Sequence, residues 1–153
     1  MNNNDVLRRV RYILDFNDNK MVDIFASAGL EVSREQIILF LKKDDDPDYL
    51  NCKDSEFAVF LNGLINEKRG KKEGAEPKIE ASLTNNIVFR KLIIAFNLKA
   101  DEVIKILELA DLRVSKHELS AFFRKPDHKN YRECKSQILR NFLMGLQLKF
   151  RSN

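Results

Sequence analysis

Residues Phe40–Lys53, FLKKDDDPDYLNCK, decide how the rest of this sequence is interpreted, because a close copy follows at Phe122–Lys135, FFRKPDHKNYRECK. Both stretches hold Phe, Lys, Asp, Tyr, Cys and Lys at the same spacing. Moving the chain by about 82 residues aligns the flanking sequence without a gap, with roughly twenty identities in about 68 positions against about four expected by chance. The chain is therefore predicted to be a tandem duplication.

The apolar residues of each copy recur at helical spacing, and no stretch alternates as a strand would. In the first copy, Asn3 and Asn4 offer capping oxygens to a helix over about 4–16, and Gly29 is expected to end a short second helix. We predict an all-α fold: a tandem duplication of a small four-helix module, with the two modules packed as one pseudo-symmetric unit.

The third helix of each copy has a clear start signal. Ser33 with Gln36, and Ser115 with Glu118, fit a capping box, in which each side chain satisfies a backbone N–H of the other residue. These boxes predict that the third helices begin directly after the two serines.

The fourth helix of each copy is predicted to start near Cys52 or Cys134, and it carries Gly63 or Gly145 inside an apolar stripe. A glycine inside a helix costs about 1 kcal/mol relative to alanine. We expect these glycines to permit a close helix crossing at the place where the two modules meet.

The charge differs between the two copies. Residues 1–70 carry 10 Lys or Arg and 13 Asp or Glu, a net of −3, whereas residues 83–153 carry 14 and 7, a net of +7. Residues 71–82 carry 3 of each and hold Gly and Pro without periodicity, so they are interpreted as a linker. The predicted domains are 1–70, net acidic, and 83–153, net basic, which suggests different partners or mutual attraction.

No apolar run reaches the roughly 18 residues that span a bilayer, and the first residues do not resemble a signal peptide. We expect a cytoplasmic protein without membrane contact. Two cysteines, one per copy, do not form a disulfide framework, and each is interpreted as a packed thiol, with a reactive thiol near a helix N-terminus as the alternative.

The quoted motifs resemble those of the YehS family of uncharacterised bacterial proteins. The similarity lies in the Asn-Asn pair that opens each copy, the capping-box serine, the Lys-x-Asp-x-x-x-Tyr-x-x-Cys-Lys stretch and the Phe-Leu-x-Gly-Leu helix. The resemblance covers nearly the whole chain. It implies two copies of a small helical domain in a bacterial cytoplasmic protein, and it supplies no catalytic residues.

The sequence offers little for catalysis. His117 and His128 are the only histidines, and no phosphate loop or nucleophile motif is present, so we expect no enzymatic activity, no cofactor and no metal. Asp44, Asp45, Asp46 and Asp48 could resemble a Mg²⁺ or Ca²⁺ loop, but the second copy has Pro126, Asp127, His128 and Asn130 at these places, which favours a solvated acidic turn.

The repeated stretch supplies the main candidate binding site. An Asp and a Tyr between helices can tie a turn, whereas lysines around an aromatic ring can hold an anion or an acidic segment, and both interpretations stay open. The candidate residues are Lys43, Asp45, Tyr49, Lys53, Lys125, Asp127, Tyr131 and Lys135.

The basic second copy supplies a candidate nucleic-acid site. Residues 28–33 lie between two predicted helices, as in a helix-turn-helix, and the equivalent region of the second copy is rich in cations. The turn is longer than in a DNA-reading motif, however, and the third helix uses many positions for the core. The candidate residues are Arg113, Lys116, Arg124, Lys125, Lys129, Arg132 and Lys135.

The sequence favours a non-catalytic binding or adaptor protein whose repeated stretch contacts protein partners or a second copy of the chain. Two alternatives remain. One is a nucleic-acid-associated protein that binds phosphates through the basic copy. The other is a small-molecule sensor with a pocket between the two modules.

Overall fold

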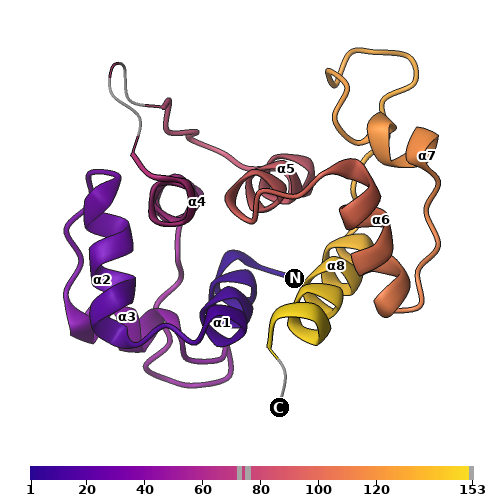
Figure 1. The fold of residues 1–153 in the computed structure, drawn as a ribbon. Coiled ribbons are helices and arrows are strands. Elements are labelled where there is room, and N and C mark those ends of the chain that lie inside the picture. The colour runs from indigo at the N-terminus through magenta and orange to yellow at the C-terminus, as the bar shows by residue number, and fades with distance from the viewer. Residues whose placement is uncertain (72–73, 75–76, 152–153) are drawn as a thin grey trace. The chain divides into compact units, whose positions relative to one another are not determined.

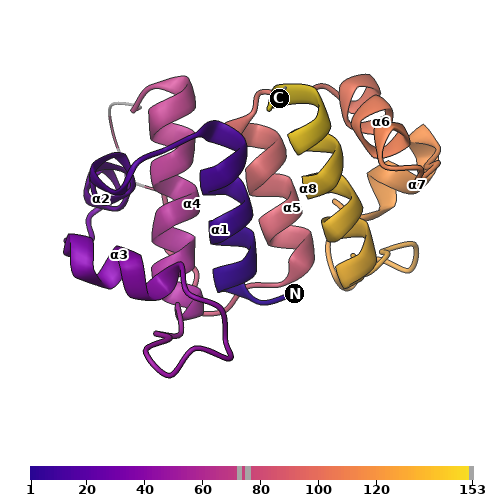
Figure 2. The same cartoon turned by 90° about the horizontal axis from the view of Figure 1, so that it is seen from below.

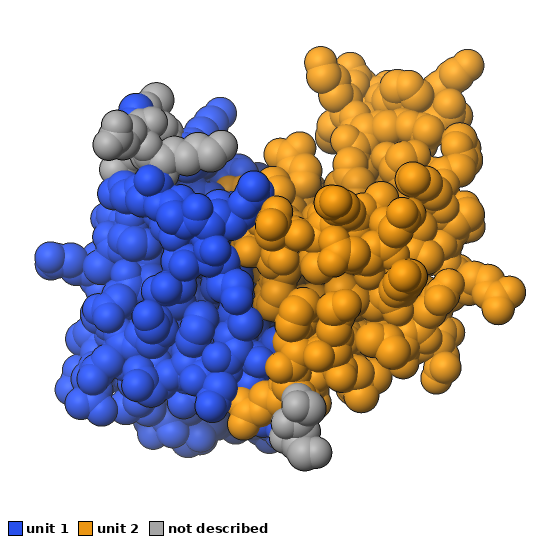
Figure 3. Space-filling model, in the orientation of Figure 1, with its two compact units in different colours: residues 1–83 blue, residues 84–153 orange. Residues whose placement is uncertain are grey.

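The computed structural model describes residues 1–71, 74 and 77–151, and this part of the chain holds eight helices and no strand (Figure 1). The chain divides into two compact units, Met1–Leu83 and Thr84–Asn153, which are coloured separately in Figure 3. The predicted all-α fold is confirmed. Part of the predicted linker 71–82, namely residues 72–73 and 75–76, lies outside the described residues.

The four helices of each unit follow the predicted order. Unit 1 contains α1 (Asn3–Leu14), α2 (Asp18–Ser27), α3 (Arg34–Phe40) and α4 (Asp54–Arg69). Unit 2 contains α5 (Asn85–Ala95), α6 (Ala100–Leu109), α7 (Lys116–Ala121) and α8 (Ser136–Phe150). None of the helices built from described residues is both long and apolar enough to cross a membrane.

Both predicted capping boxes are present. The Gln36 amide donates to Ser33 Oγ at 3.1 Å, and the Ser33 amide donates to Gln36 Oε1 at 2.9 Å. Ser115 and Glu118 form the same pair of bonds at 3.0 Å each. These bonds fix where α3 and α7 begin, because each satisfies two donors at the helix start.

The predicted caps of the first helices are wrong. Asn2 caps α1, since its side chain accepts from the Asp5 amide at 2.8 Å, and Thr84 caps α5 in the same way. Asn3 and Asn4 are helical residues instead. The helix ends at Leu14, before the predicted residue 16, because Asp15 turns into the left-handed region at φ 55°.

The predicted role of Gly29 is confirmed: α2 ends at Ser27 with Ala28 as its C-cap, and Gly29 follows at φ 99°, where Asp111 of unit 2 has φ 62°. The fourth helices, predicted to start near the cysteines, begin two residues after them, at Asp54 and Ser136. The cysteines themselves lie in the extended approach to the helix, which brings their backbone within reach of other elements.

Aromatic side chains dominate the core of each unit. In unit 1 the rings of Phe25 and Phe60 lie 5.3 Å apart between centroids, and in unit 2 those of Phe89 and Phe142 lie 4.8 Å apart. All four side chains are fully buried. Burial of such large apolar side chains is the main favourable term for folding each unit.

The two helical glycines mark close crossings inside each unit. A Cβ at Gly63 would lie 2.0 Å from the Ile24 carbonyl oxygen in α2, and one at Gly145 would lie 2.0 Å from the Ile106 carbonyl oxygen in α6. Figure 2 shows α2 nearly end-on while α4 runs lengthwise, so the two helices cross steeply. The predicted close crossing is present, but its placement between the modules is wrong, because each glycine contacts a helix of its own unit.

Replacing either glycine with alanine is expected to destabilise the protein. The gain of about 1 kcal/mol in helix propensity is smaller than the cost of forcing the backbones apart, which for overpacked cores is about 1–3 kcal/mol or more. Urea unfolding of Gly63→Ala and Gly145→Ala measures the balance. Unchanged or increased stability in both variants would show that the crossing tolerates a methyl group.

Candidate functional site

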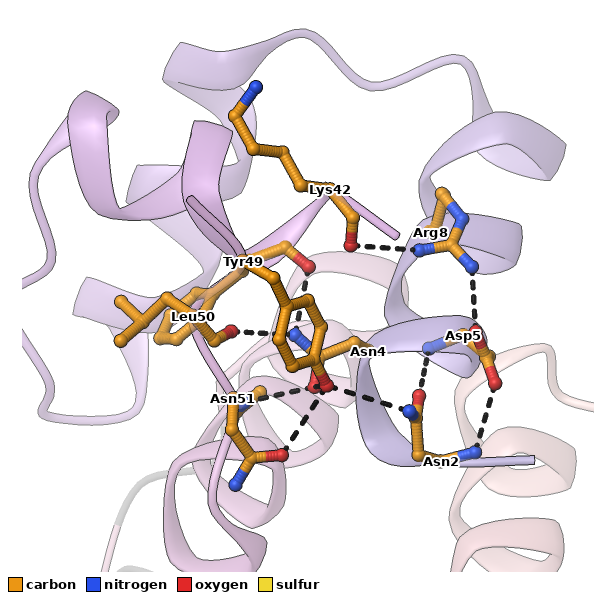
Figure 4. Close-up of polar contacts among 10 residues, drawn as sticks. Asn2, Asn4, Asp5, Arg8, Lys42, Tyr49, Leu50 and Asn51 are labelled. Atoms are coloured by element: carbon orange, nitrogen blue, oxygen red, sulfur yellow. Dashed lines mark hydrogen bonds and ion pairs between the residues drawn. The ribbon is translucent and has the colours of Figure 1, made fainter. Parts of the chain in front are cut away.

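The repeated stretches form two loops: the first loop, residues 41–53, between α3 and α4, and the second loop, residues 123–135, between α7 and α8. The first loop is held by the buried side chain of Asn4 (Figure 4). Its Nδ2 donates to the carbonyl oxygens of Phe40 at 2.9 Å and Leu50 at 2.8 Å. Its Oδ1 accepts from the Cys52 amide at 3.0 Å and from the Tyr49 hydroxyl at 2.9 Å.

These four bonds use the full capacity of a carboxamide, which has two N–H donors and two acceptor positions on its oxygen. A buried polar side chain is tolerated when it is satisfied in this way. The bonds reach the end of α3, the end of the loop and the approach to α4. Asn4, in the first turn of α1, therefore holds the two ends of the first loop together.

Asn86 holds the second loop by the same backbone contacts. Its Nδ2 donates to the carbonyl oxygens of Phe122 at 2.9 Å and Arg132 at 2.8 Å, and its Oδ1 accepts from the Cys134 amide at 2.9 Å. The neighbouring Asn85 donates to the Cys134 carbonyl at 3.0 Å, as Asn3 does to the Cys52 carbonyl at 3.0 Å. The Asn-Asn pair that opens each copy is therefore a clamp on the loop.

Sequence reasoning missed this role, since asparagine at a helix start is usually a cap. A signal was available. Asn4 lies three residues before Leu7 and six before Val10, on the side of α1 that is buried. A polar residue that occupies a core position in both copies of a duplication indicates a buried hydrogen-bonding role.

A shared turn shapes the tip of both loops, although different residues form it. The Asp48 amide donates to Asp46 Oδ1 at 2.8 Å, and the Asn130 amide donates to His128 Nδ1 at 3.0 Å. Of the two interpretations left open for the repeated Asp, the one in which it ties the turn finds no support, because Asp45 and Asp127 are exposed and accept no hydrogen bond within the described part of the chain. The side chains one position later, Asp46 and His128, accept the hydrogen bonds of the turn.

The eight candidate binding residues fall into two groups. Tyr49 and Tyr131 are half-buried, whereas the remaining six are exposed: Lys43, Asp45, Lys53, Lys125, Asp127 and Lys135. Burial, with Asp44 and Asp5 nearby, raises the pKa of the Tyr49 hydroxyl, which keeps it a donor to Asn4. These six side chains lie on the outside of the loops, and one of them, Lys135, pairs with Glu133 at 3.3 Å.

The two cysteines are buried free thiols at 1% exposure each. Burial, with smaller effects from Glu56 and Asp54, raises the pKa of the Cys52 thiol to about 12. Burial also raises the pKa of Cys134 to about 12, against a lowering effect of Arg132. A reactive thiol needs a depressed pKa and access, so these environments fit the packed-thiol interpretation.

Several of the seven nucleic-acid candidates are engaged within unit 2. Arg132 pairs with Glu118 at 3.2 Å and lies 5.1 Å from the centroid of the Phe122 ring. Lys116 pairs with Asp101 at 3.7 Å, Lys135 pairs with Glu133 at 3.3 Å, and Arg124 donates to the Asn130 carbonyl. The other three are exposed and have no carboxylate partner among the described residues: Arg113, Lys125 and Lys129.

The helix-turn-helix interpretation finds little support in the helices that it needs. Six residues, 28–33, separate α2 from α3, and the helices in the recognition position contain seven residues in α3 and six in α7. Both also bury core residues, such as Ile37 and Leu119. A recognition helix lies in the major groove with its N-terminal residues against the base edges, and helices of six and seven residues offer only a short face for that contact.

A family model described as "Protein of unknown function (DUF1456)" matches the chain twice, over residues 3–70 and 85–152. The chain belongs to the DUF1456 family. The two matched segments coincide with the two copies of the duplication, and each contains a complete set of four helices. The predicted resemblance to the YehS family is confirmed.

The sequence of this DUF1456 chain is similar to that of "Uncharacterized protein YehS" of Escherichia coli (strain K12). The two sequences are 50% identical over 149 residues, which is 95% of this chain and 94% of the relative. No solved structure matches the chain.

Removing either clamp is expected to destabilise the unit that contains it. Asn4→Ala and Asn86→Ala leave two carbonyls and one amide without their partner, and each unsatisfied buried group costs about 1–3 kcal/mol. We expect a loss of about 2–5 kcal/mol in the free energy of unfolding, measured by urea denaturation.

A matched pair of tyrosine variants tests the hydrogen bond from the Tyr49 hydroxyl to Asn4, which has no counterpart among the described residues of unit 2. Tyr49→Phe removes the donor to Asn4 and should cost about 1 kcal/mol. Tyr131→Phe should leave stability unchanged, because its hydroxyl makes no hydrogen bond within the described chain. Equal effects in the two variants would contradict the assigned difference between the clamps.

The buried thiols predict a loss of stability at alkaline pH. Their pKa is about 12 in the folded protein against 9.0 for an ordinary thiol, so the folded state keeps protons that the unfolded state releases. The contribution of the two protonated thiols to the free energy of unfolding is fully present below pH 9. It falls between pH 9 and 12, by about 1.4 kcal/mol per pH unit for each thiol. In Cys52→Ala with Cys134→Ala this part of the slope should vanish, and an unchanged slope in urea unfolding from pH 8 to 11 would refute the assignment.

Proposed function

We propose that this DUF1456 protein is a non-catalytic adaptor that presents two loops of the same backbone frame and different charge to different partners. The observation that carries the proposal is the clamp by Asn4 and Asn86, which gives both loops the same anchoring while their outer residues differ. A loop that is ordered before binding loses less entropy when a partner docks.

The charges of the two loops diverge strongly. The first loop has three Lys and four Asp, a net of −1, whereas the second has five Lys or Arg and two acidic residues, a net of +3. In the first loop, Asp44, Asp45 and Asp48 are exposed and have no ion-pair partner among the described residues. The fourth, Asp46, pairs with Lys42 at 3.7 Å and accepts from the Asp48 amide.

These charges define the chemistry of the partners. The first loop suits a basic protein surface, and the second loop suits an acidic one, because complementary potentials steer association and reject like-charged surfaces. The charged side chains stand outside the clamp, so they can change without loss of the frame. The adaptor role follows from two such surfaces on one chain.

Charge reversal in each loop tests the adaptor role. The first-loop variant, Asp44→Lys with Asp45→Lys, should lose proteins that the native chain captures from a bacterial lysate in low salt. The second-loop variant, Lys125→Glu with Lys129→Glu, should lose a different set. The control variant, Lys105→Glu with Arg140→Glu, reverses two exposed cations of α6 and α8 and should keep both sets. Identical captures by all variants, read by quantitative mass spectrometry, would refute the role of the loops.

A second candidate function, phosphate binding to RNA or DNA, is favoured by the three cations without carboxylate partners, Arg113, Lys125 and Lys129. Contacts with three phosphates predict a fall in affinity of roughly 40-fold between about 50 and 200 mM salt, independent of base sequence. Fluorescence anisotropy with mixed-sequence RNA and duplex DNA measures this. The second-loop variant should lose binding, whereas equal binding by that variant and the native chain would exclude this surface.

A further inference from the structure

The exposed charges of the two loops are complementary to each other. The first loop offers the carboxylates of Asp44, Asp45 and Asp48, and the region of the second loop offers the cations of Arg113, Lys125 and Lys129. Neither set has an ion-pair partner within the described part of the chain, whereas Lys116, Arg132 and Lys135 nearby do. The charged groups of each set are therefore available to pair with groups outside the described part of the chain.

We infer that the partner is a second copy of this chain: the first loop of one copy binds the second loop of another. This inference rests on the proposed function and names one partner of both loops. Charge complementarity is the argument for it, since the two sets are opposite in sign and equal in the number of unpaired groups, three each. The two loops are also always present at equal concentration, because every copy of the chain carries both.

The frames of the two loops make such a contact feasible. Both are closed by a buried asparagine that bonds the loop at equivalent carbonyls and an equivalent amide. Both tips carry the same turn, from Asp46 in one and His128 in the other. Two ordered loops lose little conformational entropy when they meet.

The geometry of the contact determines the type of assembly. One contact between a first loop and a second loop leaves a pair of copies with one free loop of each kind. These two loops either bind each other, which gives a two-fold symmetric dimer with two equal contacts, or bind further copies, which gives a ring or an open chain. Because the paired charges are exposed, the contact should weaken steeply as salt is raised.

Sedimentation velocity of the full chain at about 50 and 500 mM salt tests the inference. In low salt the average mass should rise with protein concentration above the 17.9 kDa of one chain, and in high salt it should return to that value. The first-loop variant carries two basic loops and the second-loop variant carries two acidic loops, so each should remain a monomer by itself. The control variant, Lys105→Glu with Arg140→Glu, should associate as the native chain does.

The decisive step is to mix the two loop variants in equal amounts. The inference predicts that association returns in the mixture, because acidic loops of one variant can bind basic loops of the other. A native chain that stays monomeric in low salt, or a mixture that stays monomeric, overturns the inference. The proposed function fails separately, when the loop variants capture the same lysate proteins as the native chain, so the two failures are distinguishable.

Discussion

One buried carboxamide in each unit holds together elements that are distant in the sequence. Asn4 bonds residues 36, 46 and 48 positions away, and Asn86 repeats these separations. The cost of burying an amide is met only when its donors and acceptors are all satisfied. That requirement fixes the end of α3 or α7, the path of the loop and the approach to α4 or α8 at the same time.

The clamp also separates the parts of the loop that determine its shape from the exposed side chains to which the proposed function assigns the contact with a partner. Backbone groups and one buried side chain hold the frame, so the outer residues can differ between the two loops while the frame stays the same. The first loop has four aspartates, and the second has five lysines and arginines. A duplicated fold with unlike surfaces is suited to binding unlike partners, and here the two surfaces are also suited to each other.

Local signals in the sequence predicted much of the fold, because they act between near neighbours. The capping boxes at Ser33 and Ser115 are examples, and the duplication itself came from comparing the chain with its own second half. Roles that depend on distant residues were harder to predict. The position of Asn4 at a helix start suggests a cap, and only the fold shows its partners in the loop. Gly63 indicates a close helix crossing, but the sequence does not show that the neighbour is Ile24. The turn at the loop tip could not be predicted from the repeat, because the accepting side chain is an aspartate, Asp46, in one copy and a histidine, His128, in the other.

The most direct test of the clamp is native-state amide hydrogen exchange, followed by NMR, at residues of the two loops. The account predicts strong protection of the Cys52 and Cys134 amides, which donate to buried asparagine oxygens, and rapid exchange of the exposed Asp45 and Asp127 amides. Exchange at the two cysteines as fast as at the two aspartates would contradict it, because the loops would then lack the ordered frame on which the binding role depends.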